Sequence, residues 1–127
     1  MKKVLIADDE MGWINFHKGV VQGLLGADVV VDTVLCAKDG YNLVLENEME
    51  PYDYLITDLH MERDFFPKKA GIWLIEQIQS LPSYKNIKII IISDTPNLKS
   101  IADPYNAYCI SKREVINSLE KYKALLQ

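Results

Sequence analysis

The chain has 127 residues, of which 49% are apolar and 25% are charged, and its formal net charge is −4. We expect a single globular domain over residues 1–127, because this composition excludes disorder and this length allows one hydrophobic core. The negative charge argues against nucleic-acid binding, and no apolar run is long enough to cross a membrane. Cys36 and Cys109 lie far apart without metal-ligand spacing, so we interpret them as reduced interior residues of a cytoplasmic protein.

Short apolar runs alternate along the chain with longer amphipathic segments. The apolar runs, which we interpret as β-strands, are Val4–Ala7, Val29–Leu35, Tyr54–Thr57, Ile87–Ile92 and Tyr108–Ile110. Several of them are β-branched and continuously apolar, which is typical of parallel strands buried on both faces.

The segments between these strands have helical spacing of their apolar residues. We expect helices over Met11–Leu25, around Tyr41–Leu45, from Gly71 to Leu81 before Pro82, and over the last pattern of Val115, Leu119, Tyr122 and Leu126, with only a weak helix at Asn97–Ala102. Strand–helix alternation of this kind predicts an α/β fold: a doubly wound, flavodoxin-like sheet of five parallel strands in the order 2-1-3-4-5, with helices on both faces.

Polar residues follow the strands at the edge of the sheet where such folds bind ligands. Asp8 and Asp9 follow the first strand, Asp58 the third, Ser93 the fourth and Lys112 the fifth. Three carboxylates at one edge repel one another, so we expect a hard divalent cation, Mg²⁺, among them. Asp58 could then act as a nucleophile toward phosphorus, with Ser93 and Lys112 stabilising the charge on the phosphoryl oxygens.

These residues, in their order, resemble the response-regulator receiver domain of two-component signal transduction. The motifs that carry the resemblance are Val4–Glu10, Ala37–Gly40, Asp53–Met61, Ile90–Ser93 and Ser111–Lys112. The resemblance implies that Asp58 takes a phosphoryl group from a sensor histidine kinase or a phosphotransfer protein, and that the change regulates contacts with a downstream protein. It also implies Mg²⁺ bound by Asp8 or Asp9, by Asp58 and by the backbone carbonyl of His60.

Four features depart from the family pattern. The segment Glu62–Ala70 is longer than usual, Asp94 follows Ser93 where a small residue is preferred, and Arg113 follows Lys112 in place of proline. Cys109 stands where the family has its switch aromatic. Two alternatives therefore stay open: a degenerate receiver that binds proteins without phosphorylation, and a magnesium-dependent phosphatase or phosphotransferase. We expect an acceptor domain rather than a turnover enzyme.

The aromatic residue beside Cys109 is Tyr108. Neighbouring residues of a strand point to opposite faces, so only a β-bulge would let Tyr108 take the place of the missing aromatic. Without a bulge, we expect activation to be read through the loops around the site. There Phe65 and Phe66 would cover the edge of the site or form a partner contact, with loose packing of the two rings on the third helix as the alternative.

Overall fold

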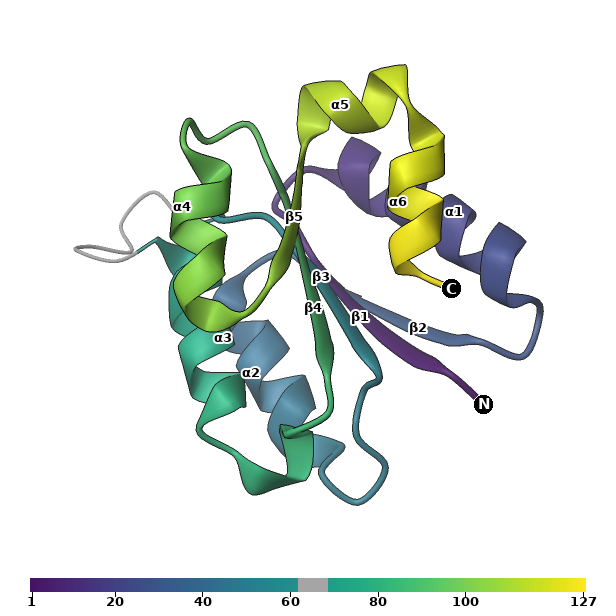
Figure 1. The fold of residues 1–127 in the computed structure, drawn as a ribbon. Helices are drawn as coiled ribbons and strands as arrows, with labels where there is room; N and C mark the ends of the chain where they lie inside the picture. The colour runs from purple at the N-terminus through teal and green to yellow at the C-terminus, as the bar shows by residue number, and fades with distance from the viewer. Residues whose placement is uncertain (62–68) are drawn as a thin grey trace.

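The computed structural model describes residues 1–61 and 69–127. They form a parallel sheet in the order β2-β1-β3-β4-β5, made of β1 (Lys3–Ala7), β2 (Val30–Val34), β3 (Tyr54–Thr57), β4 (Lys88–Ser93) and β5 (Tyr108–Ser111) (Figure 1). The predicted fold and strand order are confirmed, and the strand boundaries differ by a residue or so at several ends.

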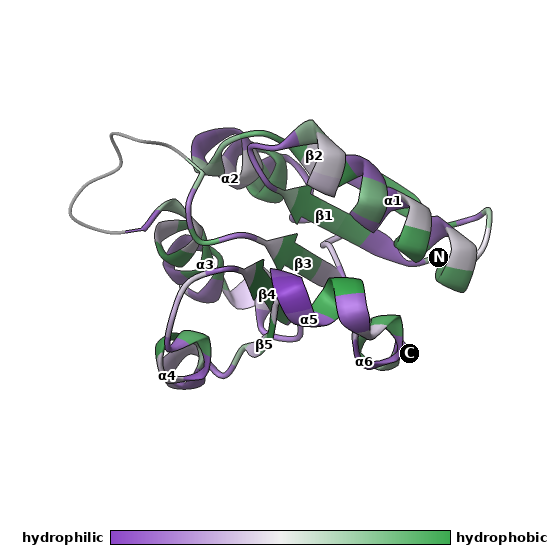
Figure 2. Ribbon diagram, turned by 90° about the horizontal axis from the view of Figure 1, so that it is seen from above, coloured by the Kyte–Doolittle hydropathy of each residue, from purple (hydrophilic) through white to green (hydrophobic). Residues whose placement is uncertain are grey.

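Helices cover both faces of this sheet (Figure 2). Helices α2 (Ala37–Glu46), α3 (Ala70–Gln79) and α4 (Leu98–Ala102) lie on one face, and α1 (Met11–Leu25), α5 (Lys112–Asn117) and α6 (Leu119–Leu125) lie on the other. Two short 3₁₀ turns, η1 (Pro82–Tyr84) and η2 (Asp103–Tyr105), precede β4 and β5. In the part of the chain that is described, no helix combines the length and apolarity needed to span a membrane.

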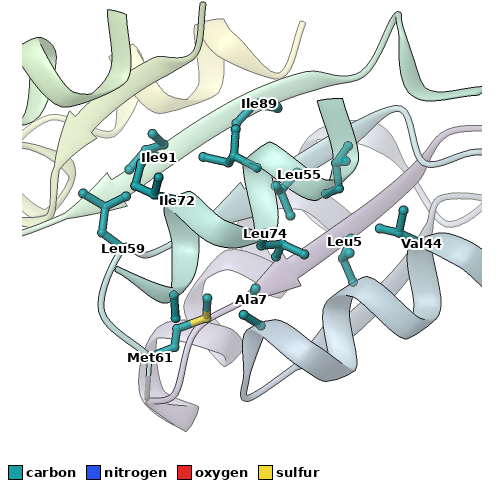
Figure 3. Packing of buried hydrophobic residues seen from close by; sticks show 14 of the residues in the cluster. Leu5, Ala7, Val44, Leu55, Leu59, Met61, Ile72, Leu74, Ile89 and Ile91 are labelled. Carbon is teal, nitrogen blue, oxygen red and sulfur yellow. The ribbon is translucent and has the colours of Figure 1, made fainter. Parts of the chain in front are cut away.

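Alternate side chains of each central strand point to opposite faces of the sheet and pack in two separate hydrophobic cores. The α3-side core joins strand residues such as Leu5, Leu55 and Ile91 to residues of α2, α3 and α4, including Val44 and Leu74 (Figure 3). The α1-side core joins Val4, Ile6, Ile56, Ile90, Ile92 and Ile110 to Ile14 and Val21 of α1, to Val115 of α5, and to Tyr122 and Leu126 at the end of the chain.

The last helical pattern does not form one helix, which is a correction to the sequence interpretation. Ser118 has extended backbone angles, φ −147° and ψ 94°, and it separates α5 from α6. Val115 and Tyr122 are nevertheless both buried in the α1-side core. The apolar spacing survives the break, which is why the sequence pattern does not reveal it.

Strand β5 contains no bulge. Its four residues pair one to one with β4, from Ile90 with Tyr108 to Ser93 with Ser111. Tyr108 is 50% exposed and lies over the ammonium of Lys88, whereas Cys109 packs against the α3-side core. Tyr108 therefore does not take the place of the missing aromatic. Cys36 and Cys109 are both half-buried, so the expectation that they are interior residues is wrong in degree.

Candidate functional site

The site lies at the carboxyl ends of β1 and β3, which are neighbours in the sheet. Ala7 and Thr57 are paired in the register of these strands, so the next residues, Asp8 and Asp58, emerge together. Their amides continue the ladder, because the Asp58 N–H donates to the carbonyl of Ala7 at 3.1 Å and the Asp8 N–H donates to the carbonyl of Val34 at 3.2 Å. Two carboxylates are thus fixed at the carboxyl edge of the sheet by backbone hydrogen bonds.

Lys112, the first residue of α5, joins these two carboxylates. Its Nζ donates to Asp58 Oδ2 at 2.7 Å and lies 3.3 Å from Asp8 Oδ2. All three side chains are buried, with 5% of Lys112, 7% of Asp58 and 1% of Asp8 exposed. Burial by itself would lower the pKa of Lys112, but the hydrogen bond and charge of Asp58, with those of Asp8, outweigh it and hold that pKa above its usual value. The lysine is therefore a fixed positive charge between two carboxylates.

Asp8 carries the least satisfied group of the site. Its Oδ1 accepts the Glu10 N–H at 2.9 Å, whereas its Oδ2 is buried without a hydrogen bond, as judged over residues 1–61 and 69–127. Burial raises the pKa of Asp8 to about 6, against the opposing effects of the Glu10 N–H and of Lys112. An oxygen of this kind suits a hard cation such as Mg²⁺, whose charge would compensate the buried carboxylates.

Asp58 is oriented by the turn that follows β3. Its Oδ1 accepts the Leu59 N–H at 2.6 Å and, more weakly, the His60 N–H at 3.4 Å. A hydrogen bond joins this turn to the start of α3, because the Gly71 N–H donates to the carbonyl of Leu59 at 3.0 Å. A Cβ at Gly71 would lie only 2.1 Å from the Asp58 carbonyl oxygen. Gly71 is thus a requirement of the site, although the sequence marked it only as a helix start.

The remaining predicted site residues are less closely gathered. Ser93 is buried and its hydroxyl hydrogen-bonds the Thr95 hydroxyl at 2.8 Å. Asp9 and His60 are exposed. Within the described ranges, no group of three or more His, Cys, Asp or Glu side chains is arranged to hold a metal ion. The structure therefore brings together Asp8, Asp58 and Lys112, and leaves Asp9 outside this group.

Beside Lys112 lies an open depression of about 820 Å³. Its lining includes Trp13, Arg113 and Asp94, and Asp94 is exposed. The Trp13 ring centroid lies 5.0 Å from Lys112 Nζ, a contact that the sequence analysis did not predict. The long segment after Met61, with Phe65 and Phe66, falls on residues 62–68, outside the described residues.

No protein-family model and no curated protein sequence matches this chain. Solved structures do match. The signal receiver domain of a DNA-binding response regulator from Colwellia psychrerythraea 34H is 20% identical with a TM-score of 0.76, over 99% of this chain and 98% of that one. Chemotaxis protein CheY4 of Vibrio cholerae is 18% identical with a TM-score of 0.69, over 95% and 98%.

A third match is RcsB from Salmonella enterica serovar Typhimurium, in a structure bound to a promoter in the presence of the phosphomimetic BeF₃⁻. It is 24% identical with a TM-score of 0.74, over 100% of this chain and 99% of that one. The chain therefore has the fold of response-regulator receiver domains.

Proposed function

We propose that this chain is a phosphoacceptor receiver domain of two-component signalling, and that Asp58 is the residue that accepts the phosphoryl group. The observation that carries the proposal is the buried contact of Lys112 with both Asp58 and Asp8, at the carboxyl edge of a sheet with the receiver order. One ammonium thus compensates two buried carboxylates, and its ion pair with Asp8 leaves Asp8 Oδ2 without a hydrogen bond among the described residues. The excess of buried negative charge is what a site for a divalent cation needs.

The donor would be a phosphohistidine of a sensor kinase or of a phosphotransfer protein. As an Asp58 oxygen forms its bond to phosphorus, the phosphorus–nitrogen bond of the donor breaks and the imidazole leaves with the bonding electrons. Lys112 meets the negative charge of the transferred oxygens. Ser93 can do the same once its hydroxyl exchanges Thr95 for a phosphoryl oxygen.

Mg²⁺ would be held by Asp8 and Asp58 and, as the family resemblance implies, by the backbone carbonyl of His60, with Asp9 as a further carboxylate next to Asp8 in the sequence. When bound, Mg²⁺ would neutralise the carboxylates and the incoming phosphoryl group. The chain's own residues supply the nucleophile, its orientation by the Leu59 N–H, and the positive charge of Lys112. Output would pass through contacts with a downstream protein in the cytoplasm, and we expect no turnover of a second substrate.

The test is intact mass after incubation with acetyl phosphate, with Mg²⁺ and with chelator. We expect one added phosphoryl group on the wild type with Mg²⁺, none in chelator, and none on Asp58→Asn. Phosphorylation of Asp58→Asn to the wild-type extent would refute the assignment. Because self-phosphorylation and autodephosphorylation together also release phosphate from acetyl phosphate, it is steady hydrolysis of a phosphate ester such as p-nitrophenyl phosphate that would favour the phosphatase alternative.

The second candidate is a degenerate receiver that binds proteins without phosphorylation. The exposed position of Asp9 favours it, because only two of the three predicted carboxylates are gathered with Lys112. A wild type that gains no mass with Mg²⁺, from either acetyl phosphate or a phosphorylated histidine phosphotransfer protein, would support this candidate.

A further inference from the structure

Among the described residues, Asp58, Asp8 and Trp13 contact the Lys112 ammonium, and the two carboxylates belong to the chemistry of the site. Asp58 and Asp8 contact Nζ through their Oδ2 atoms at 2.7 Å and 3.3 Å. The third neighbour is the ring of Trp13, whose centroid lies 5.0 Å from the same atom. Trp13 belongs to α1, which is far from Lys112 in the sequence and on the same face of the sheet as α5.

The Trp13 ring is held in place by a cluster of aromatic side chains. It packs edge to face on Phe16 and at a tilt on His17, with centroid distances of 5.5 Å in both cases. His17 is 2% exposed, and its Nδ1 shares a hydrogen bond of 2.7 Å with the hydroxyl of Tyr122 on α6. The face that Trp13 presents to Lys112 is therefore fixed by both α1 and α6.

The two carboxylate contacts of Lys112 are the ones that phosphorylation would disturb. A phosphoryl group on Asp58 would offer Lys112 new oxygens in exchange for the bond to Oδ2. A divalent cation on Asp8 would repel a second cation from the same carboxylate. The contact of Lys112 with Trp13 involves neither of these carboxylate oxygens. It can therefore be present both before and after Asp58 is phosphorylated.

We propose that Trp13 is a positioning residue for Lys112, whose aromatic face keeps the ammonium beside Asp58 while its carboxylate partners change. This inference rests on the proposed function of Asp58, because it assigns Trp13 a role in that phosphoryl transfer. The ring attracts the ammonium without a formal negative charge. It thus holds the lysine without competing with the phosphoryl group, as a third carboxylate would.

The first experiment compares Trp13→Leu with Trp13→Phe in their rate of phosphorylation by acetyl phosphate at saturating Mg²⁺. Loss of the aromatic face in Trp13→Leu is expected to slow the reaction about fivefold, and Trp13→Phe should stay within about twofold of the wild type. Tyr41→Leu is the matched control, since it removes an aromatic ring that packs on Trp73 on the opposite face of the sheet from Trp13, and it should keep the wild-type rate.

The second experiment reads the contact directly, and it does not depend on the folding of Trp13→Leu. In a Trp73→Phe background, Trp13 is the remaining tryptophan, and we expect the ammonium 5.0 Å from its ring to quench its fluorescence. Lys112→Met should raise this emission. Loading with beryllofluoride and Mg²⁺ should leave the emission well below the Lys112→Met level, because the ammonium stays on the ring.

The outcomes separate the two proposals. A wild type that is phosphorylated on Asp58, together with a Trp13→Leu variant of equal rate, overturns the role of Trp13 and leaves the proposed function intact. Emission that rises to the Lys112→Met level on beryllofluoride loading also overturns it. A wild type that accepts no phosphoryl group overturns the proposed function, and the role of Trp13 with it.

Discussion

On the α2–α3–α4 face of the sheet, most buried core residues are aliphatic, and one of the two buried tyrosines, Tyr84, donates to the backbone carbonyl of Val44 at 2.8 Å. On the α1–α5–α6 face, the core instead contains a buried imidazole and phenol, His17 and Tyr122, bonded to each other. That pair supports Trp13, which contacts Lys112. The α2–α3–α4 face thus supports the backbone at Asp58, whereas the α1–α5–α6 face positions the Lys112 ammonium next to the Asp58 carboxylate.

On the α2–α3–α4 face, Gly71 of α3 contacts the backbone of the site. A substitution there is expected to have the largest effect on the free energy of unfolding. Gly71→Ala would place a methyl group against the Asp58 carbonyl and the Leu59 Cα, so we expect a loss of about 3 kcal/mol or more in the free energy of unfolding. Gly40→Ala on α2 is the matched control: its Cβ meets the flexible end of Leu74 at 3.2 Å, and it should cost less than about 1 kcal/mol. Urea unfolding of both variants checks this, and equal costs would contradict it.

On the α1–α5–α6 face, the buried imidazole of His17 should make the free energy of unfolding depend on pH. Burial, with the charge of Lys112, lowers the pKa of His17 from 6.5 to about 4. The unfolded chain therefore binds more protons between these values, so this contribution to stability is present above pH 6.5 and is lost as the pH falls toward 4. Its size is about 3 kcal/mol at most.

The measurement for this second prediction is the free energy of unfolding of the wild type and of His17→Gln at pH 7 and pH 4. The wild type should lose more stability than the variant over this interval. The variant is needed because Asp8 acts in the opposite sense: its pKa is raised to about 6, so its contribution falls as the pH rises from 3.8 to 6. An identical loss in both proteins would show that His17 is readily protonated in the fold.

One hydroxyl can be removed from each core, which compares the two faces directly. Tyr122→Phe leaves the buried Nδ1 of His17 without a partner and should cost about 2 kcal/mol. Tyr84→Phe removes one hydrogen bond from the Val44 carbonyl, but this carbonyl still accepts the Asn47 N–H. The variant should therefore cost only about 1 kcal/mol of the free energy of unfolding. Chemical denaturation measures both, and a larger cost for Tyr84→Phe would reverse the comparison.

The smallest effect is expected at Asp94, on the rim of the depression beside Lys112. This carboxylate is exposed, so its repulsion of an incoming phosphoryl donor is screened by water and salt. Asp94→Ala should speed phosphorylation by acetyl phosphate about twofold at low ionic strength and less at high salt. An unchanged or slower variant would mean that Asp94 does not act on the donor.

Sequence reasoning succeeded where the signal was local. The β-branched runs predicted the strands, and the polar residues after them predicted that Asp8, Asp58 and Lys112 would meet. The break at Ser118 could not be predicted, because the apolar residues on either side keep helical spacing.

The two contacts that sequence reasoning missed are tertiary ones. Trp13 lies within a helix and not at the end of a strand, so the strand-end pattern that brought Asp8 and Lys112 together gave no information about it. The role of Gly71 depends on how closely α3 approaches the turn after β3, which no property of the glycine itself indicates.

The interruption at Ser118 also affects how independently the end of the chain can open. It divides the segment into helices of six and seven residues, and helices this short are not stable without tertiary contacts. Helix α6 has such contacts, through the fully buried Tyr122 and the Leu126 carbonyl that accepts the Tyr54 hydroxyl at 3.1 Å. Helix α5 is held by Val115, by the Ser111 cap, by Lys112 itself and by an exposed ion pair of Glu114 with Lys121 of α6. The lysine that contacts both carboxylates thus lies on a helix of six residues, and we expect its local opening to cost less free energy than opening of the core around it.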